Sequence, residues 1–212
     1  MKKAFTLIEL IFAMVIIAIA FSVLPKVLYM ATKASITSLK EEAMYNAVAY
    51  AGLIRASAWD ENNTEVDDIL IVNGSDRDTS FDCDQNTSYR VGGFTGSRNC
   101  FNDKNASVLG MDSNDNNLPD DIDDFKEISV VAKNENSSRK YDINATVEYV
   151  DDTFFATSLS DNSDPESPTN SKRIEIIVYP KRKSSELGNS MVKLNFTLYN
   201  IGQLRVNKRR WN

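Results

Sequence analysis

The chain has 212 residues, with 24 Lys and Arg, 30 Asp and Glu, and no histidine. The absence of histidine excludes a histidine-based catalytic triad or zinc site, and an acidic balance without an evident basic face argues against nucleic acid as a partner. The length allows one globular domain together with an extended element.

An apolar segment begins almost at once. Lys2 and Lys3 precede it, and from Phe5 to Leu24 every residue is apolar or small except Thr6 and Glu9. As a helix, this segment is about 30 Å long, which matches the hydrocarbon thickness of a bilayer. The two lysines predict a cytoplasmic N-terminus and export of the rest of the chain.

A secretory signal peptide is the alternative interpretation of this segment. Three features oppose it. The apolar run is longer than usual, no small-residue cleavage site follows it because Pro25 and Lys26 come next, and the carboxylate of Glu9 lies inside it. A charge within lipid costs about 3 kcal/mol on insertion scales, so Glu9 is expected to have a partner.

The N-terminal sequence KKAFTLIEL, residues 2–10, resembles the class III signal of type IV prepilins and type II secretion pseudopilins. The resemblance implies cleavage by prepilin peptidase between Ala4 and Phe5, methylation of the new amine of Phe5, and retention of the apolar segment as the core of a filament. Ala4 stands where the family usually has Gly, and it is the smallest substitute.

Glu9 is the buried acid of the motif, and its charge has an evident counterpart. After cleavage, the amine of Phe5 is a cation near an apolar medium and Glu9 is an anion in the same medium, so each lowers the cost of burying the other. The two groups could pair within one subunit, because they are four residues apart on one helix. They could also pair between neighbouring subunits, which is how the family is usually described.

The helical pattern continues beyond the apolar segment. Apolar residues recur every three or four positions as far as about Trp59, which predicts one helix from Phe5 to Trp59, about 80 Å long. Pro25 is expected to bend this helix or to open it locally. The predicted organisation is a leader over residues 1–4, a transmembrane or filament-core helix over 5–24, its amphipathic continuation over 25–59, and an exported β-rich domain over 60–212.

The remainder of the chain alternates between loops and strands. Alternating apolar residues in the last two segments predict a sheet with one buried face. The fold class is therefore α+β, with a long N-terminal helix packed against an antiparallel sheet, as the pilin resemblance also implies. The predicted strands are Asp68–Asn73, Ser88–Phe94, Glu127–Lys133, Tyr141–Val150, Arg173–Tyr179 and Met191–Tyr199.

The two cysteines, Cys83 and Cys100, lie in segments rich in Asn, Asp, Ser and Gly that are typical of loops. In an exported domain they can form one disulfide, whereas two reduced thiols remain the alternative. A bridge closing a loop of this size contributes about 3 kcal/mol on the chain-entropy model.

A loop over residues 112–123 has the ligand spacing of an EF-hand-type calcium site. Asparagines, Asn114 and Asn116, occupy loop positions three and five. Neutral ligands favour weak binding, with a dissociation constant of about 10⁻⁴ to 10⁻³ M. Asn117 stands where Gly is usual, Asp123 replaces the final Glu, and Asp124 is a substitute for it. A solvated acidic turn is the alternative. The predicted Ca²⁺ ligands are Asp112, Asn114, Asn116, the carbonyl of Leu118, Asp120 and Asp123.

These features favour a structural filament subunit without catalytic residues. Its expected partners are prepilin peptidase, other pilin or pseudopilin subunits and, before assembly, the inner membrane, which it crosses once with the C-terminal domain in the periplasm. In a filament, the subunit would lie in the periplasm or at the cell surface. The alternatives are an anchored, exported calcium-binding or interaction domain that does not polymerise and, more remotely, an anchored enzyme. A plain anchor has no use for Glu9.

Overall fold

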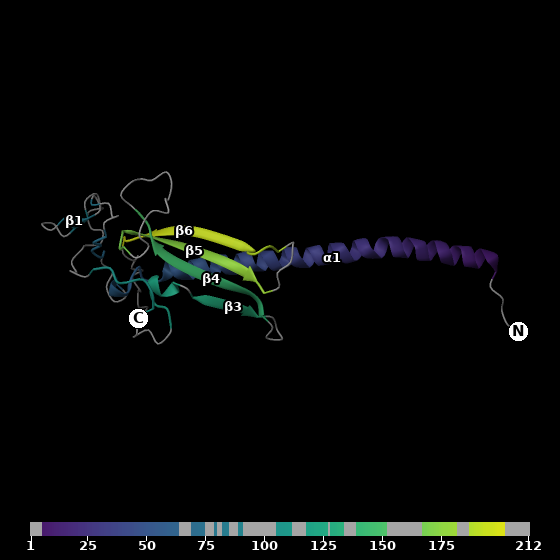
Figure 1. The fold of residues 1–212 in the computed structure, drawn as a ribbon, viewed down its shortest axis with the longest axis horizontal. Coiled ribbons are helices and arrows are strands. Elements are labelled where there is room, and N and C mark those ends of the chain that lie inside the picture. Colours follow the sequence, from purple (N-terminus) through teal and green to yellow (C-terminus); the bar gives the residue numbers. More distant parts are fainter. Residues whose placement is uncertain are drawn as a thin grey trace, which may run out of the picture. The chain divides into compact units, whose positions relative to one another are not determined.

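The computed structural model describes residues 6–63, 69–74, 79, 82–84, 89–90, 105–111, 118–126, 128–133, 139–151, 167–181 and 187–201 (Figure 1). The chain divides into two compact units, Met1–Glu42 and Ala43–Asn212, which are described separately below. The first unit is helical, and the second contains the sheet.

Helix α1 runs from Leu7 to Ala56 and continues through Pro25 without a break. It ends before the predicted end at Trp59. The backbone N–H of Ser57 donates to the carbonyl of Ile54 at 3.2 Å, and this tighter contact closes the last turn. A second turn follows, in which the backbone N–H of Asp60 donates to the side chain of Asn63 at 3.0 Å. Asx residues compete with helix in this way, because their side chains satisfy nearby backbone groups.

The second unit is built on an antiparallel sheet with the strand order β3-β4-β5-β6 (Figure 1). All four strands were predicted from sequence, to within a few residues at each end, and the α+β fold class is confirmed. The strands are β3 (Ser129–Lys133), β4 (Arg139–Tyr149), β5 (Ser171–Pro180) and β6 (Val192–Tyr199).

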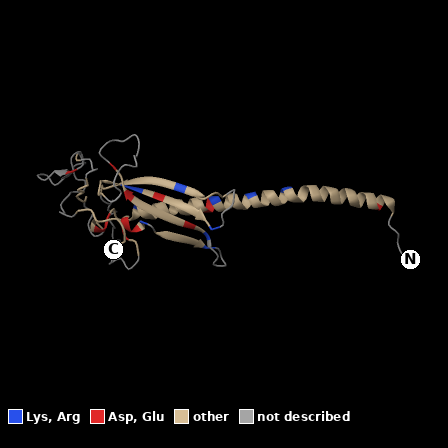
Figure 2. Ribbon diagram, in the orientation of Figure 1, with Lys and Arg blue, Asp and Glu red and all other residues tan. Residues whose placement is uncertain are grey.

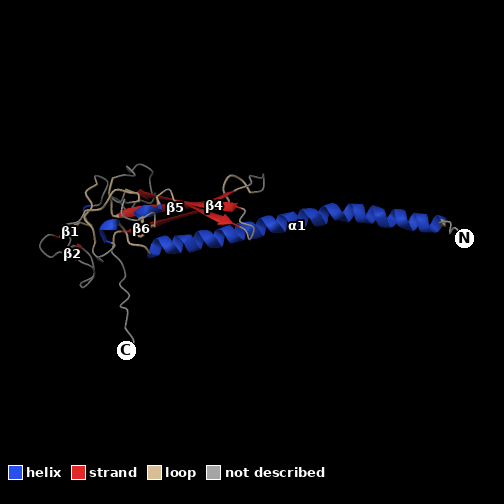
Figure 3. Ribbon diagram, turned by 90° about the horizontal axis from the view of Figure 1, so that it is seen from below, coloured by secondary structure: helices blue, strands red, loops and turns tan. Residues whose placement is uncertain are grey.

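One face of this sheet forms the core of the second unit together with the last part of α1 (Figures 1 and 3). The register places Ile143 opposite Val178, Ala145 opposite Ile176 and Val147 opposite Ile174. All six side chains are buried, which confirms the predicted alternation for β5. The apolar residues that were predicted to alternate in β6 are only partly buried. From the helix, mostly small residues are buried, and small side chains allow a helix to approach a sheet closely. They are Ala43, Ala47, Tyr50, Ala51 and Ile54.

The opposite face of the sheet is polar. Arg173 donates to Glu148 at 2.9 Å, and Lys193 lies 2.5 Å from Glu175, with all four side chains partly exposed. Exposed pairs of this kind contribute about 0–1 kcal/mol, because water screens them. The face is therefore a solvated surface.

The earlier segments of the second unit contain little regular structure among the described residues. Strands β1 (Cys83–Asp84) and β2 (Tyr89–Arg90) pair with each other, and the latter lies in the predicted strand Ser88–Phe94, whose residues 91–94 lie outside the described residues. The predicted strand Asp68–Asn73 is reduced to a single bridge between Ile71 and Asn105. A side chain takes the place of a neighbouring strand here, because the amide of buried Asn200 bonds both backbone groups of Leu70, at 2.8 and 3.2 Å.

Candidate functional site

The first candidate site is the N-terminus, where the predicted cleavage residues Ala4 and Phe5 lie outside the described residues. The carboxylate of Glu9 accepts bonds from the backbone N–H of Thr6 at 3.4 Å and from its hydroxyl at 3.3 Å. This is the carboxylate half of a capping box, in which an acid in the first helical turn reaches back to the capping residue. This role of Glu9 was not predicted from the sequence, although the pattern Thr-x-x-Glu is its recognised signature.

The first part of α1 is uncovered. Every large apolar side chain between Leu7 and Met30 is at least 48% exposed, and Leu7 is 77% exposed. No charged residue lies between Glu9 and Lys26 (Figure 2). We call Leu7–Met30 the apolar half-helix. By length and composition, α1 contains a stretch that can cross a membrane. Such a surface requires an apolar partner, either lipid or protein.

The second candidate site is a charge buried in the core of the second unit. Lys172 is in β5 on the same face as Ile174 and Ile176, and its side chain is wholly buried. Its Nζ contacts Oδ1 of Asp123, lies 3.5 Å from Oδ2 of Asp60, and donates to the carbonyl of Trp59 at 2.7 Å. We call Lys172, Asp60 and Asp123, with the neighbouring Asp121 and Asp124, the buried charge centre.

Three elements of the second unit bring this centre together. Strand β5 provides Lys172, the short helix η3 (Asp123–Phe125) provides Asp123, and the turn after α1, which leads into η1 (Glu61–Asn63), provides Asp60. Two rings enclose the amine, since Nζ lies 3.8 Å from the centre of the Trp59 ring and 5.2 Å from that of Tyr149. Aromatic faces attract cations, and this attraction strengthens where water is excluded.

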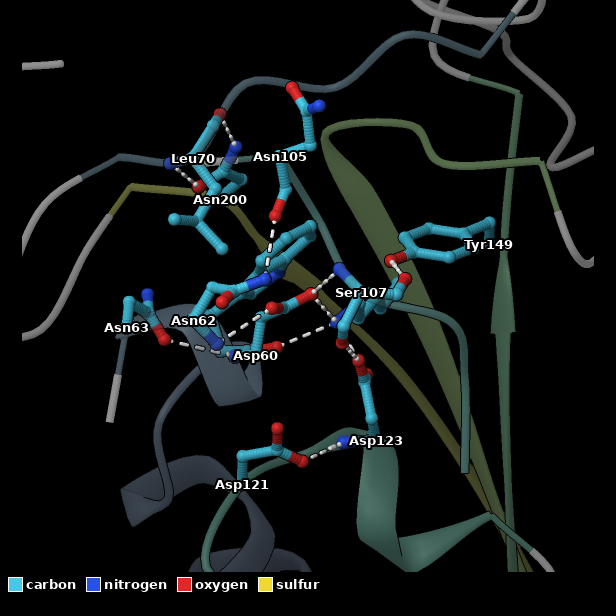
Figure 4. Close-up of polar contacts among 12 residues, drawn as sticks. Asp60, Asn62, Asn63, Leu70, Asn105, Ser107, Asp121, Asp123, Tyr149 and Asn200 are labelled. Carbon is cyan, nitrogen blue, oxygen red and sulfur yellow. Dashed lines mark hydrogen bonds and ion pairs between the residues drawn. The ribbon is translucent and has the colours of Figure 1, made fainter. Parts of the chain in front are cut away.

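The acids of the centre are held mainly by backbone N–H groups (Figure 4). Asp60 accepts from the backbone of Asn62 at 3.0 Å and of Ser107 at 2.9 Å. Asp121 accepts from the backbone of Asp123 at 2.6 Å and of Asp124 at 3.1 Å. The hydroxyl of Ser107 donates to Oδ2 of Asp123 at 3.1 Å. These bonds offset part of the cost of removing carboxylates from water.

Burial shifts two acids of the centre, Asp121 and Asp123, toward their neutral forms. Desolvation, assisted by the nearby Asp123, raises the pKa of Asp121 to about 8. Desolvation also raises the pKa of Asp123 to about 7, against the attraction of Lys172. The pKa of Tyr149 is raised by burial and by the surrounding acids. Burial therefore favours the protonated forms of Asp121 and Asp123 near neutral pH, because the cost of desolvation outweighs the attraction of Lys172.

The buried charge centre was not predicted from the sequence, although the sequence contains one signal for it. Lys172 is in phase with Ile174, Ile176 and Val178, so the alternation of β5 places it on the buried face. A lysine on a buried face requires a partner, because an unpaired buried charge is very costly. The sequence contains no comparable signal for Asp60, because no periodic pattern marks a residue in a turn.

The structure describes only part of the predicted calcium loop. Asp112, Asn114 and Asn116 lie outside the described residues, while Leu118 and Asp120 are exposed. Asp123 directs its two oxygens to Lys172 and Ser107. Within the described ranges, no group of three or more acidic, cysteine or histidine side chains is arranged to hold a metal ion. The calcium site stays a prediction, and so does the disulfide, because Cys100 and the side chain of Cys83 also lie outside the described residues.

Comparison with known proteins bears on the N-terminus. Residues 1–25 match the family model described as a prokaryotic N-terminal methylation motif. No curated protein and no solved structure matches the chain. The chain therefore carries the prepilin-type signature of type IV pilins and pseudopilins, as predicted from residues 2–10. With the apolar half-helix, this signature supports a membrane-anchored, pilin- or pseudopilin-type protein that prepilin peptidase processes.

Proposed function

We propose that this chain is a structural subunit of a type IV pilus or of a type II secretion-like pseudopilus, cut between Ala4 and Phe5 and methylated on the new amine. The observation that carries the proposal is the apolar half-helix, which is uncovered along its length and follows a matched methylation motif. A lone membrane anchor explains the apolar surface. It does not explain the methylation motif that precedes the helix.

Glu9 supplies the assembly chemistry in this proposal. In the single chain, its carboxylate satisfies the start of α1 through Thr6. In a filament, it pairs with the methylated amine of Phe5 on a neighbouring subunit, which sets the register between subunits. Breaking one side of such a buried pair costs about 3–5 kcal/mol, because the remaining charge is left alone in an apolar medium.

The proposed location follows from the same segment. Lys2 and Lys3 keep the N-terminus in the cytoplasm, the apolar half-helix crosses the inner membrane, and the sheet-containing unit is periplasmic. Prepilin peptidase and other subunits of the filament are the partners. Assembly then moves the apolar half-helix from lipid to the filament core, where the neighbouring helices cover it.

The experiment compares Glu9→Gln with Glu41→Gln, an exposed acid on the same helix. Both variants should insert, be exported and be cleaved, because the lysines and the cut site are intact. Glu9→Gln should be strongly depleted from sheared or pelleted filaments and should accumulate in the inner membrane, whereas Glu41→Gln should behave as wild type. Immunoblots of both fractions, with sequencing of the mature N-terminus, measure this.

Three outcomes contradict the proposal or a part of it. A mature protein that still begins at Met1, or that begins beyond Leu24, excludes processing as a prepilin. Equal incorporation of wild type and Glu9→Gln excludes charge pairing as the assembly mechanism. Correct cleavage without incorporation of even the wild type into filaments favours the anchored domain that does not polymerise.

Calcium binding and the Cys83–Cys100 disulfide are accessory parts of the proposal. The dense acidic sequence over residues 112–124 supports the first, and the expected export of the domain supports the second. Millimolar Ca²⁺ should raise the melting temperature of the full chain in detergent, and Asp112→Ala should abolish the rise, because a ligand of the folded state stabilises it by mass action.

For the disulfide, a reductant that breaks the bond between Cys83 and Cys100 should lower the melting temperature. An unchanged melting curve in either case removes the corresponding feature.

A further inference from the structure

The contact between Lys172 and Asp123 joins a nucleophile to an electrophile in a sealed part of the core. The side chains of Lys172 and Asp123 are 0% and 1% exposed, and Nζ touches Oδ1 of the carboxyl group. An amine and a carboxylic acid condense to an amide with loss of water. In solution this reaction does not proceed measurably, because the groups are charged, dilute and surrounded by water. Fixed contact in a dry core removes all three obstacles.

The neighbouring groups supply the other requirements of this reaction. Oδ2 of Asp60 lies 3.5 Å from Nζ, where it can accept a proton as the nitrogen attacks. The hydroxyl of Ser107 donates to Oδ2 of Asp123 at 3.1 Å, which is the oxygen that gains negative charge. The carbonyl of Trp59 accepts from Nζ at 2.7 Å and fixes the position of the amine.

We propose that Lys172 and Asp123 form an intramolecular isopeptide bond between Nζ and Cγ in the folded chain. The proton that the ammonium shares with Oδ1 moves to that oxygen, which leaves a neutral amine and a neutral acid. Nζ then attacks Cγ and gives one proton to Asp60, while Oδ2 carries the negative charge beside Ser107. The bond from Cγ to Oδ1 breaks as Asp60 returns the proton. The products are one amide and one water molecule, and Asp60 is regenerated.

The sheet contains an internal control for this proposal. Lys193 and Glu175 also hold an amine against a carboxylate, at 2.5 Å, but these side chains are 55% and 28% exposed. Water solvates both charges there, so the ion pair is favoured over the neutral pair that condensation requires. The same two functional groups are therefore expected to react in the core and not on the surface.

The bond would close a covalent loop between η3 and β5. The two residues are 49 positions apart in the chain. Because the link is covalent, it would persist after the chain unfolds and would keep these two distant segments together. Tension between η3 and the sheet would then be carried by a covalent bond. The inference uses only the second unit and does not depend on assembly into a filament.

The test is peptide mapping of the full chain, purified in detergent, reduced, denatured and digested with a protease. A branched peptide should join Lys172 to Asp123, with a mass lower than the sum of its two parts by one water molecule. The peptides of Lys193 and Glu175 should be recovered unlinked from the same digest. The purification is done with a chelator, so that no cation competes for Asp123.

Two variants make the result specific. Lys172→Arg keeps the positive charge but provides no primary amine, so the branched peptide should disappear. Asp60→Asn keeps the reacting pair and removes the proton acceptor, so near-ultraviolet circular dichroism should remain native while the branched peptide is lost. Complete recovery of unlinked Lys172 and Asp123 peptides from folded wild type would falsify the bond. If the mass still shows the loss of one water molecule in Lys172→Arg, another reaction causes it, and the proposal is equally overturned. If the link forms unchanged in Asp60→Asn, the role of Asp60 as proton acceptor is overturned.

Discussion

The apolar half-helix and the buried charge centre reverse the usual distribution of residues in a protein. In the half-helix, large apolar side chains are exposed and no charge lies between Glu9 and Lys26. In the centre, Lys172 and four carboxyl groups are at most 3% exposed. The half-helix leaves its favourable interactions to partners outside the chain. The centre obtains all of its described partners from within the second unit.

Exposed apolar residues and buried charged residues are both energetically unfavourable in a single chain, and the two regions use them for different purposes. An exposed apolar surface provides free energy for leaving water, at about 25 cal/mol per Å² of surface removed from it, whether lipid or neighbouring helices then cover that surface. A buried charge provides little net stability, because desolvation offsets the attraction, but it strongly penalises any arrangement in which its partners are absent. Changes in the half-helix should therefore alter assembly, and changes in the centre should alter folding.

The largest effect is expected at the centre. Lys172→Met should lower the free energy of unfolding by about 3–5 kcal/mol, because Asp60 and Asp123 then remain buried without their cation or covalent partner. Lys193→Met is the matched control in the same sheet and should cost about 0–1 kcal/mol, since its pair with Glu175 is partly exposed. Denaturant unfolding in detergent measures both. Equal losses for the two variants would contradict the distinction between buried and exposed pairs.

Two isoleucines test the same comparison with apolar side chains. Ile176→Ala should lower the free energy of unfolding of the second unit by about 2–5 kcal/mol, because it leaves a cavity at a wholly buried position. Ile16→Ala, at a position 64% exposed, should leave that free energy unchanged. The unfolding curves of Ile176→Ala and Ile16→Ala, each compared with that of the wild type, measure the two changes in stability. A loss of stability from Ile16→Ala would show that the half-helix contributes to the fold of the sheet-containing unit.

The smallest effect is expected at the start of α1. Thr6→Ala removes the hydroxyl that bonds to Glu9 and should weaken the first turn by about 0.5–2 kcal/mol. Hydrogen exchange should accelerate at the amide of Leu10, which bonds to the carbonyl of Thr6 at 3.2 Å. Thr32→Ala, inside the same helix, is the control and should not change exchange there. Unchanged exchange at Leu10 in Thr6→Ala would show that the hydroxyl of Thr6 contributes nothing to the cap.

The sequence by itself determined the long helix, the main sheet and the class of protein. Local periodicity predicted one long helix and the four strands of the main sheet, because side chains must alternate to bury one face. The N-terminal signal was also readable, since its residues are contiguous in the sequence. Even Lys172 could be placed on the buried face from the alternation of β5 alone.

Only the tertiary structure decided which groups Lys172 would meet. Asp123 is 49 positions away in the chain and Trp59 is 113 positions away, and no pattern in the sequence connects such distant groups. The same holds for Asn200, whose amide bonds the backbone of Leu70 across 130 positions. Periodicity records which side of an element faces the core. The choice of partner for a buried polar group depends on how separate elements pack, which only the folded chain determines.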